Sequence, residues 1–100
     1  MAEKLSDSGR RGALAKLKGW KKVRGRNAIE KQFQFKNFNE AFGWMSRIAM
    51  LAEKIDHHPE WSNVYRTVNV VLTTHDADGV SELDIKMATA MNRFSAENLT

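Results

Sequence analysis

The sequence predicts an α+β domain with the element order α-β-β-α-β-β-α, in which hairpins form the sheet and helices cover one of its faces. Three segments repeat apolar residues at helical spacing, and two others alternate apolar and polar residues with a period of two. A chain of 100 residues can bury one modest core. We therefore expect a single domain over residues 1–100, with a loose end at residues 1–5.

The first helix is expected to begin near residue 6. Ser6 or Ser8 can cap it, because a serine oxygen there accepts a main-chain N–H of the first turn. Gly19 is suited to close it, since glycine adopts the left-handed conformation that often follows a helix. Its apolar positions are Ala13, Leu14 and Leu17.

A β-hairpin is expected to follow this helix. Residues 20–23 form a weak strand, and residues 25–27, which read Gly-Arg-Asn, form the turn. Residues 29–36 alternate between two faces, as in a half-buried antiparallel strand. One face has Ile29, Lys31, Phe33 and Phe35, and the other has Glu30, Gln32, Gln34 and Lys36.

A long helix is expected to begin at Asn37 or Asn39 and to end at about Lys54. Its apolar residues fall into two adjacent stripes, Phe38, Phe42, Met45, Ala49 and Ala52 in the first, and Ala41, Trp44, Ile48, Leu51 and Ile55 in the second. Together they exceed the apolar width of an ordinary surface helix. One stripe can face the sheet and the other a second helix or another subunit. A helix covered by its own neighbours alone is an equal alternative.

The remaining elements are a second hairpin and a final helix. Pro59 ends the long helix, the chain is then extended, and a bend is expected at residues 66–67. Val68, Val70 and Leu72 point to one face of the next strand, whose β-branched residues favour a strand over a helix. Residues 76–79 form a turn. Ser81 caps the final helix, which has Leu83, Met87, Met91 and Phe94 on one face.

Composition narrows the cellular setting. The chain has no cysteine, so disulfides and thiolate chemistry are excluded. We expect a cytoplasmic protein without membrane segments, because no apolar run is long enough to span a bilayer and the first residues lack the apolar core of a signal peptide. Residues 1–36 have a net charge of +8 and residues 37–100 of −4. We interpret the basic half as a solvated surface and do not expect a nucleic-acid partner, because no aromatic residues are interleaved for base stacking.

The three histidines of the chain lie within nineteen residues of each other, as the pair His57-His58 and as His75. Imidazole gains and loses protons near neutral pH, so such a cluster suits acid–base chemistry. Packing or surface histidines are an equally good interpretation of these residues taken alone. A metal site is disfavoured even with Asp56 or Asp76 as a further ligand, because adjacent residues do not face one point and no His-Glu-x-x-His spacing is present.

These residues also resemble the signature of the pterin-4a-carbinolamine dehydratases. The matching residues are Glu53, His57, His58, Pro59, Trp61, Tyr65, Thr74, His75 and Asp84. The resemblance extends over roughly residues 12–95 and includes Gly19-Trp20. Leu83 departs from it, since relatives often have arginine there. The resemblance implies one four-stranded antiparallel sheet with three helices packed on one side, and a homo-oligomer, either dimer or tetramer.

The resemblance further implies a lyase that removes water from a 4a-hydroxytetrahydropterin and so serves an aromatic amino acid hydroxylase. We expect no metal and no cofactor, since the pterin is the substrate. Four residues are expected to be catalytic: His57 and His75 exchange protons, His58 holds the substrate, and Asp84 holds an imidazole. The expected substrate contacts are Glu53, His57, His58, Pro59, Trp61, Thr74, His75, Asp76 and Ala77.

Two of these acids have structural alternatives. Asp84 follows Ser81 at capping-box spacing, so capping and function are equal interpretations of the residue itself, and the resemblance favours function. Glu53 lies in the last turn of a helix, where an acid is slightly unfavourable, which hints at a role near the histidines. The alternative function, also implied by the resemblance, is a non-enzymatic dimerisation partner of a transcription factor.

Overall fold

The computed structural model describes residues 2–98. Within them the predicted order of helices and strands is confirmed, with one short 3₁₀ helix in addition. The elements are α1 (Asp7–Ala15), β1 (Lys21–Lys22), β2 (Ile29–Gln34), α2 (Phe38–Ile55), β3 (Glu60–Val64), β4 (Thr67–Leu72), η1 (His75–Ala77) and α3 (Glu82–Asn98). No helix among these residues is both long and apolar enough to cross a membrane.

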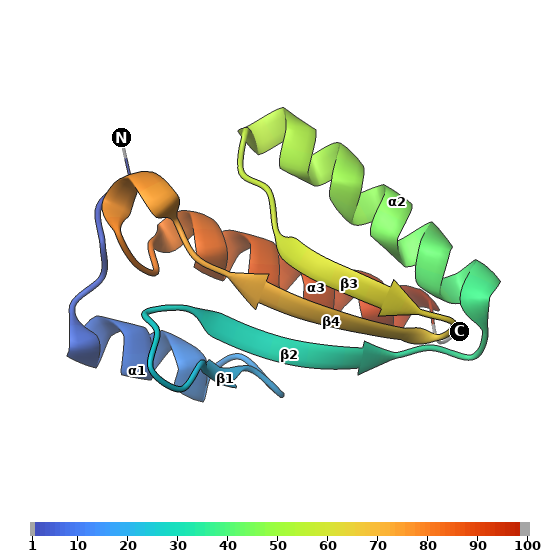
Figure 1. The fold of residues 1–100 in the computed structure, drawn as a ribbon, viewed down its shortest axis with the longest axis horizontal. Helices are drawn as coiled ribbons and strands as arrows, with labels where there is room; N and C mark the ends of the chain where they lie inside the picture. The colour runs from blue at the N-terminus through green and yellow to red at the C-terminus, as the bar shows by residue number, and fades with distance from the viewer. Residues whose placement is uncertain (1, 99–100) are drawn as a thin grey trace.

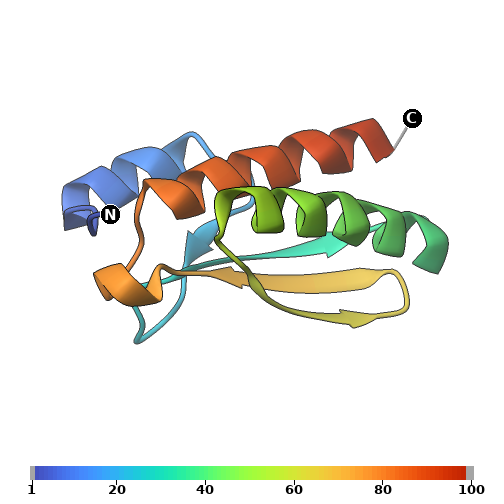
Figure 2. The same ribbon diagram turned by 90° about the horizontal axis from the view of Figure 1, so that it is seen from above.

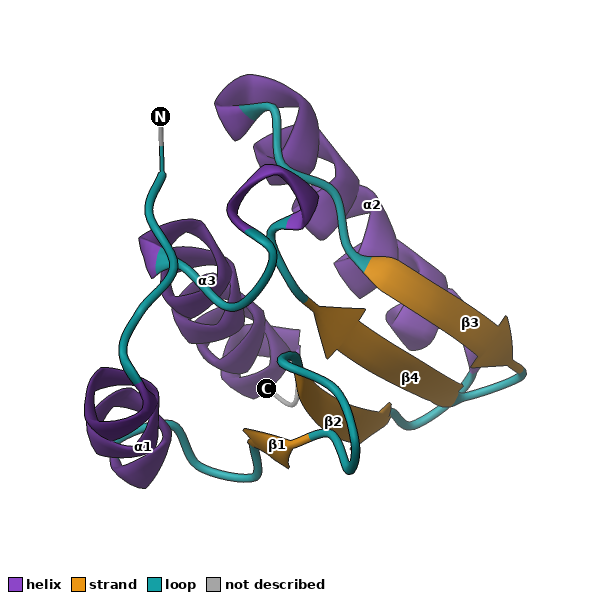
Figure 3. Ribbon diagram, turned by 60° about the vertical axis from the view of Figure 1, so that its left-hand side comes forward, coloured by secondary structure: helices purple, strands orange, loops and turns teal. Residues whose placement is uncertain are grey.

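The four strands form one antiparallel sheet in the order β1-β2-β4-β3. Each expected hairpin contributes neighbouring strands, and the two hairpins join through β2 and β4 in the centre of the sheet (Figure 1). All three helices lie on the same face of the sheet, which is the architecture predicted from the sequence (Figures 2 and 3). The connections at one end of this layer bring the histidines together.

The core lies between the sheet and the helices. Val68, Val70 and Leu72 are buried on the inner face of β4, as their alternation predicts. The ring of Phe33 on β2 packs against that of Trp44 on α2, with centroids 4.6 Å apart. Apolar burial stabilises such contacts by about 25 cal/mol per Å². The sheet is therefore fixed against α2 and α3 along its length.

The second apolar stripe of α2 packs mainly within its own chain, which is one of the alternatives that the sequence left open. Trp44 and Ile48, which belong to that second stripe, are fully buried in the core of the same chain. The exposed apolar side chains of the helix are Phe38 and Phe42 from the first stripe, and Met50. Two adjacent stripes of similar apolar content cannot be assigned to the inside or the outside from spacing alone.

Lys31 lies on the inner side of β2, where alternation placed it. Its amine donates hydrogen bonds to the main-chain oxygen of Lys18, at 2.9 Å, and to Asn92 Oδ1, at 2.8 Å. Burial lowers the pKa of Lys31 below its ordinary value, and the nearby Lys18 adds to this effect. Lys31 thus links β2 by hydrogen bonds to α3 and to the segment after α1.

Two smaller predictions are corrected. Residues 4 and 5 are not a loose end, because the Leu5 N–H donates to the Val80 oxygen at 2.8 Å and the Leu5 side chain packs against the core; Met1 lies outside the described residues. The bend between β3 and β4 lies at residues 65–66 instead of 66–67, with Tyr65 in the left-handed conformation at φ 51°. The N-caps of α1 and α2 are Ser6 and Asn37, each among the residues proposed.

Candidate active site

The three histidines gather at one end of the molecule. The end of α2, the beginning of β3 and the 3₁₀ turn after β4 lie near one another there, next to the beginning of α3 (Figure 1). His57 and His58 follow α2 directly, and His75 begins the 3₁₀ turn. The antiparallel pairing of β3 with β4 returns the chain to the same end.

A residue in the left-handed conformation ends α2 directly before the histidine pair. Asp56 caps the helix at φ 52° and ψ 47°, a conformation that aspartate tolerates better than most residues. The N–H of His57 then donates to the oxygen of Ala52 at 3.0 Å, which satisfies a carbonyl in the last turn. Because of this reversal, His57 is buried at 8% exposure whereas the His58 side chain remains 55% exposed.

His57 is held by the fully buried carboxylate of Asp84. The Nε2 atom of His57 lies 2.6 Å from Asp84 Oδ1. Oδ2 of the same carboxylate accepts from the Thr74 hydroxyl at 2.8 Å and from the Ser81 N–H at 2.9 Å. Since an ionised carboxylate only accepts, Nε2 of His57 carries a proton, and Nδ1 is the proton acceptor of the neutral ring.

The two interpretations of Asp84 are therefore compatible. Oδ2 accepts the N–H of Ser81, as the acid of a capping box does, while Oδ1 holds the imidazole. The Ser81 hydroxyl accepts the Leu83 N–H at 3.2 Å and lies 2.6 Å from the Thr74 oxygen. Because Thr74 gives its single proton to Asp84, Ser81 must donate to Thr74, and every group of this buried network has a partner.

His58 and His75 each have a carboxylate partner of their own. His58 Nε2 lies 2.9 Å from Glu53 Oε1, so the acid in the last turn of α2 does reach a histidine. His75 Nε2 lies 3.1 Å from Glu60 Oε2. Glu60 in turn accepts two hydrogen bonds from the guanidinium of Arg26, at 3.0 and 2.8 Å. Sequence reasoning missed Glu60 and Arg26, although an acid two residues after the histidine pair could have been noticed.

A cavity of about 390 Å³ joins these groups. Its size lies within the range of roughly 300–1,000 Å³ that is usual for small-molecule sites. The residues that line it are Asp56, His57, His58, Thr73, Thr74, His75, Asp76 and Leu83. All three histidines thus face one space, together with two of the other expected contacts, Thr74 and Asp76.

The other expected site residues lie outside the lining of this cavity in the described part of the chain. Glu53 and Asp84 contact the site through the histidines that they hold. Pro59 and Ala77 flank it in sequence and are half-buried. Trp61 is half-buried against the core, with its ring 6.1 Å from that of Trp44. Trp61 thus contributes to the core in this arrangement, and its contact with a substrate stays a prediction.

Among residues 2–98 no group of three or more histidine, cysteine, aspartate or glutamate side chains is arranged to hold a metal ion. Each imidazole instead pairs with a different carboxylate, and the three imidazoles line one cavity. The fold and the site together define a class of protein: a small α+β domain with a histidine-lined cavity able to give and take protons.

Comparison with known proteins places the chain within that class. The family model for pterin 4 alpha carbinolamine dehydratase matches residues 3–94, and the chain belongs to this family. A protein of Nitrobacter winogradskyi, provisionally named pterin-4-alpha-carbinolamine dehydratase, is 59% identical over 97 residues, which cover 97% of this chain and 96% of that protein. A Bradyrhizobium diazoefficiens protein of the same name is 61% identical over 95% of each chain.

A solved structure agrees with both the family and the fold. The crystal structure of a transcriptional coactivator/pterin dehydratase from Brucella melitensis is similar, with a TM-score of 0.92 and 53% sequence identity. The similarity covers 93% of this chain and 99% of that chain. The α+β architecture with three helices on a four-stranded sheet is thus shared with a solved member of the family.

Proposed function

We propose that the protein is a hydro-lyase that dehydrates a 4a-hydroxytetrahydropterin to the quinonoid dihydropterin and water. The observation that supports this most strongly is the set of three imidazole–carboxylate pairs around one cavity. Membership of the family supplies the substrate class. The pterin would be the substrate, with no metal or further cofactor, and recycling it for an aromatic amino acid hydroxylase in the cytoplasm would be the cellular role.

The reaction needs one acid and one base. The acid protonates the hydroxyl on C4a as the C–O bond breaks, and the base removes the proton from N5, whose electron pair then forms the C4a–N5 double bond. Water and the quinonoid dihydropterin are the products, and solvent restores both catalytic groups. Positioned proton transfer of this kind accelerates a reaction by about 10²–10⁴-fold.

We assign the proton transfers to His57 and His75, with one ring neutral and the other protonated. In the neutral form of either ring Nδ1 is the acceptor, because Nε2–H is engaged by a carboxylate. His58, which is exposed beside Glu53, would hold the substrate by hydrogen bonding. Thr74 and Asp76, which line the same cavity, would also contact the pterin.

An interaction role remains as a second function, because the Brucella protein is described as a coactivator as well as a dehydratase. The exposed side chains of Phe38, Phe42 and Met50 on α2 offer an apolar surface for another protein or another subunit. That role gives no reason for three paired histidines at the far end of the helix. We therefore place the dehydratase first.

The test is turnover of chemically prepared 4a-hydroxytetrahydropterin, compared with its spontaneous dehydration. We expect saturable catalysis by the purified wild-type protein, undiminished after exhaustive chelation. Catalysis lost on chelation and restored by a stoichiometric divalent ion would overturn the metal-free mechanism. No acceleration at any protein concentration would contradict the enzyme assignment and favour the interaction role.

A further inference from the structure

We propose that Glu60 is a positioning residue for His75 and that Arg26 holds Glu60 in place. This inference deepens the proposed function and rests on it for its kinetic part. The chain of contacts runs from the guanidinium of Arg26 through the carboxylate of Glu60 to the imidazole of His75. Its consequence is that the proton of the neutral His75 ring lies on Nε2 and the acceptor is Nδ1.

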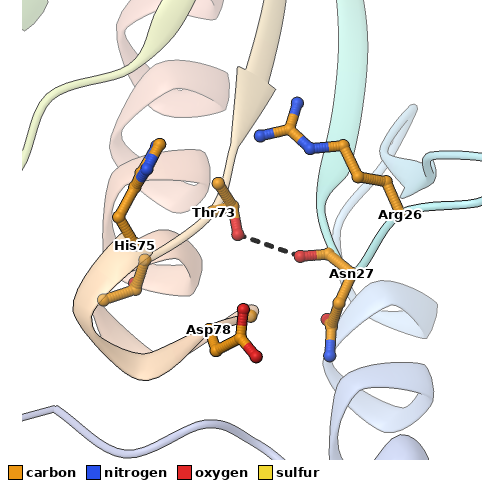
Figure 4. Close-up of a pocket in the computed structure, with 7 residues that line it drawn as sticks. Arg26, Asn27, Thr73, His75 and Asp78 are labelled. Atoms are coloured by element: carbon orange, nitrogen blue, oxygen red, sulfur yellow. Dashed lines mark hydrogen bonds between the residues drawn. The ribbon is translucent and has the colours of Figure 1, made fainter.

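The three residues come from separate parts of the fold. Arg26 lies in the turn between β1 and β2, Glu60 is the first residue of β3, and His75 begins η1. Arg26 and His75 also line a second, polar cavity of about 180 Å³, which shares Thr73, Thr74 and His75 with the histidine-lined cavity. The side chains of Arg26 and His75 lie on opposite sides of this second cavity and extend toward the same end of it (Figure 4). The contacts therefore tie both hairpins and the turn after β4 together at the site.

The contact of Arg26 with Glu60 has the geometry of a well-defined pair. Two guanidinium N–H groups donate to the two carboxylate oxygens, at 3.0 and 2.8 Å. Such two-pronged pairs fix orientation as well as charge, because the guanidinium and the carboxylate are both planar. Oε2, which accepts the shorter of these bonds, is also the oxygen that faces His75 Nε2.

The ionisation of Glu60 determines which ring nitrogen of His75 carries the proton. The hydrogen bond from Arg26 is the main cause that lowers the pKa of Glu60 to about 2, and the contact with His75 adds to it. Near neutral pH the carboxylate is therefore charged and can only accept. Nε2 must then be the donor, whichever protonation state the ring is in.

His75 needs such support more than the other catalytic histidine does. Its side chain is 76% exposed, whereas His57 is 8% exposed and enclosed by the Asp84 network. Among residues 2–98, Glu60 supplies the one side-chain hydrogen bond found for the His75 ring. Exposed ion pairs contribute little to stability, because solvent screens the charges, so this pair has little value for holding the fold together. Orientation of the ring is the effect that it can produce.

The sheet provides a matched control for Glu60. Glu60 on β3 and Glu30 on β2 flank the same β4 residue, Val71, one on each side. Glu60→Gln and Glu30→Gln therefore remove the same charge from the same row of the sheet. For the arginine, Arg26→Lys keeps the charge without the two-pronged geometry, and Arg24→Lys makes the same change in the same turn.

The direct experiment measures ring ¹⁵N–¹H correlation spectra of His75 in the wild type and in each variant, without substrate. We expect the wild-type neutral ring to carry its proton on Nε2, and Glu60→Gln to shift population toward the Nδ1–H form. Arg26→Lys should give an intermediate spectrum, and both control variants the wild-type spectrum. An unchanged His75 ring in Glu60→Gln would overturn the proposal.

Kinetics then test whether positioning matters for turnover. We expect Glu60→Gln to lower kcat about 10-fold with KM changed less than about 3-fold, because loss of positioning should remove only part of the roughly 10²–10⁴-fold that an acid–base group supplies. Wild-type kcat in Glu60→Gln despite an altered ring spectrum would overturn the catalytic part of the proposal. A wild-type protein that does not turn over the pterin would contradict the proposed function instead, and the spectra would still decide whether Glu60 holds His75.

Discussion

Each histidine of the site is paired with a carboxylate, and the environments of the three pairs differ widely. His57–Asp84 is buried, His58–Glu53 is exposed, and Glu60 supports His75 from the edge strand β3. A buried pair fixes its ring firmly, because the surrounding network leaves no alternative partner. An exposed ring can approach or leave a substrate more easily. The three rings therefore differ in how firmly the protein alone holds them.

The Asp84 network predicts a specific defect in Asp84→Asn. The wild-type carboxylate accepts from His57, Thr74 and Ser81, whereas an amide has one accepting oxygen and one donating nitrogen. Either His57 changes tautomer or the cap of α3 loses its acceptor. We expect kcat to fall by about 10-fold or more and the free energy of unfolding by about 1–3 kcal/mol.

Glu82→Gln is the control for this change, because Glu82 lies in the same helical turn and is exposed. Loss of the Glu82 charge should lower the free energy of unfolding by only a few tenths of a kcal/mol, through its interaction with the helix dipole. Urea unfolding together with steady-state kinetics measures both quantities. Equal effects of the two substitutions would mean that Asp84 acts through its charge alone and does not hold His57.

The low pKa of Glu60 predicts a pH-dependent contribution to stability. Its value in the folded protein, about 2, lies below the ordinary value of 4.5, chiefly because Arg26 donates to it. The stabilising effect is therefore complete above about pH 4.5 and is lost as the pH falls through about 2. Since both side chains are more than 40% exposed, solvent screens the pair, and we expect only a small contribution to the free energy of unfolding at neutral pH.

The measurement is the difference in unfolding free energy between the wild type and Glu60→Gln, at pH 7, 4 and 2.5. We expect a small advantage of the wild type that is constant at higher pH and shrinks below about pH 4.5. A difference that grew on acidification would have the wrong sign for a carboxylate with a lowered pKa.

At the scale of elements, a loop contact between α1, the β1–β2 turn and Val80 supports the site. Asn27 Oδ1 accepts from Arg10 and from the Val80 N–H, both at 3.2 Å. Gly79 lies against this amide, and a Cβ atom there would be only 2.6 Å from Asn27 Nδ2. The glycine is required by this close approach, since its φ angle is an ordinary one.

We therefore predict opposite effects of two glycine substitutions. Gly79→Ala should displace Asn27 and lower the free energy of unfolding by about 1–3 kcal/mol, through the lost hydrogen bonds. Gly12→Ala, in the middle of α1 with open space around it, should raise it by about 0.5–1 kcal/mol because alanine favours the helix. Thermal or urea unfolding compares them, and destabilisation by Gly12→Ala would contradict this description of α1.

The elements themselves were largely predictable from the sequence, because their signals are local. Asn37, the apolar alternation of β2 and β4, and Pro59 each act within a few residues. The sides of α2 were not predictable, since Trp44 and Phe42 belong to stripes of similar character and only the packed sheet distinguishes them. The position of Tyr65 in the turn also depended on a left-handed conformation that the sequence does not mark.

The site shows the same difference between local sequence signals and contacts that only the folded chain creates. The histidines and Asp84 were identified through a motif with characteristic spacing. Arg26 and Glu60 are separated by 34 residues. They meet only because the sheet brings the β1–β2 turn and the beginning of β3 to the same end of the molecule. Nothing in the sequence distinguishes Arg26 from the solvent-exposed basic residues around it.

At the scale of the whole molecule, exposed apolar residues on α2 predict self-association. Phe38 is 47%, Phe42 55% and Met50 67% exposed, and the rings of Phe38 and Phe42 pack 5.6 Å apart. Exposed apolar side chains of this size on one helix are typical of protein–protein contacts. We expect a homo-oligomer, dimer or tetramer, most simply with closed two-fold symmetry.

Light scattering over a dilution series tests this prediction. Phe42→Glu should lower the measured mass, whereas Ala15→Glu, which adds the same charge to α1, should not. A monomeric mass of the wild type at tens of micromolar would contradict the prediction and leave the apolar face of α2 without a partner.

If two imidazoles transfer the protons of pterin dehydration, histidine variants must slow the reaction. We predict that His57→Ala and His75→Ala each lower the kcat for 4a-hydroxytetrahydropterin by about 10-fold or more, and that the double variant is slower than either. Circular dichroism establishes that the variants are folded. Wild-type rates in a folded double variant would contradict the account.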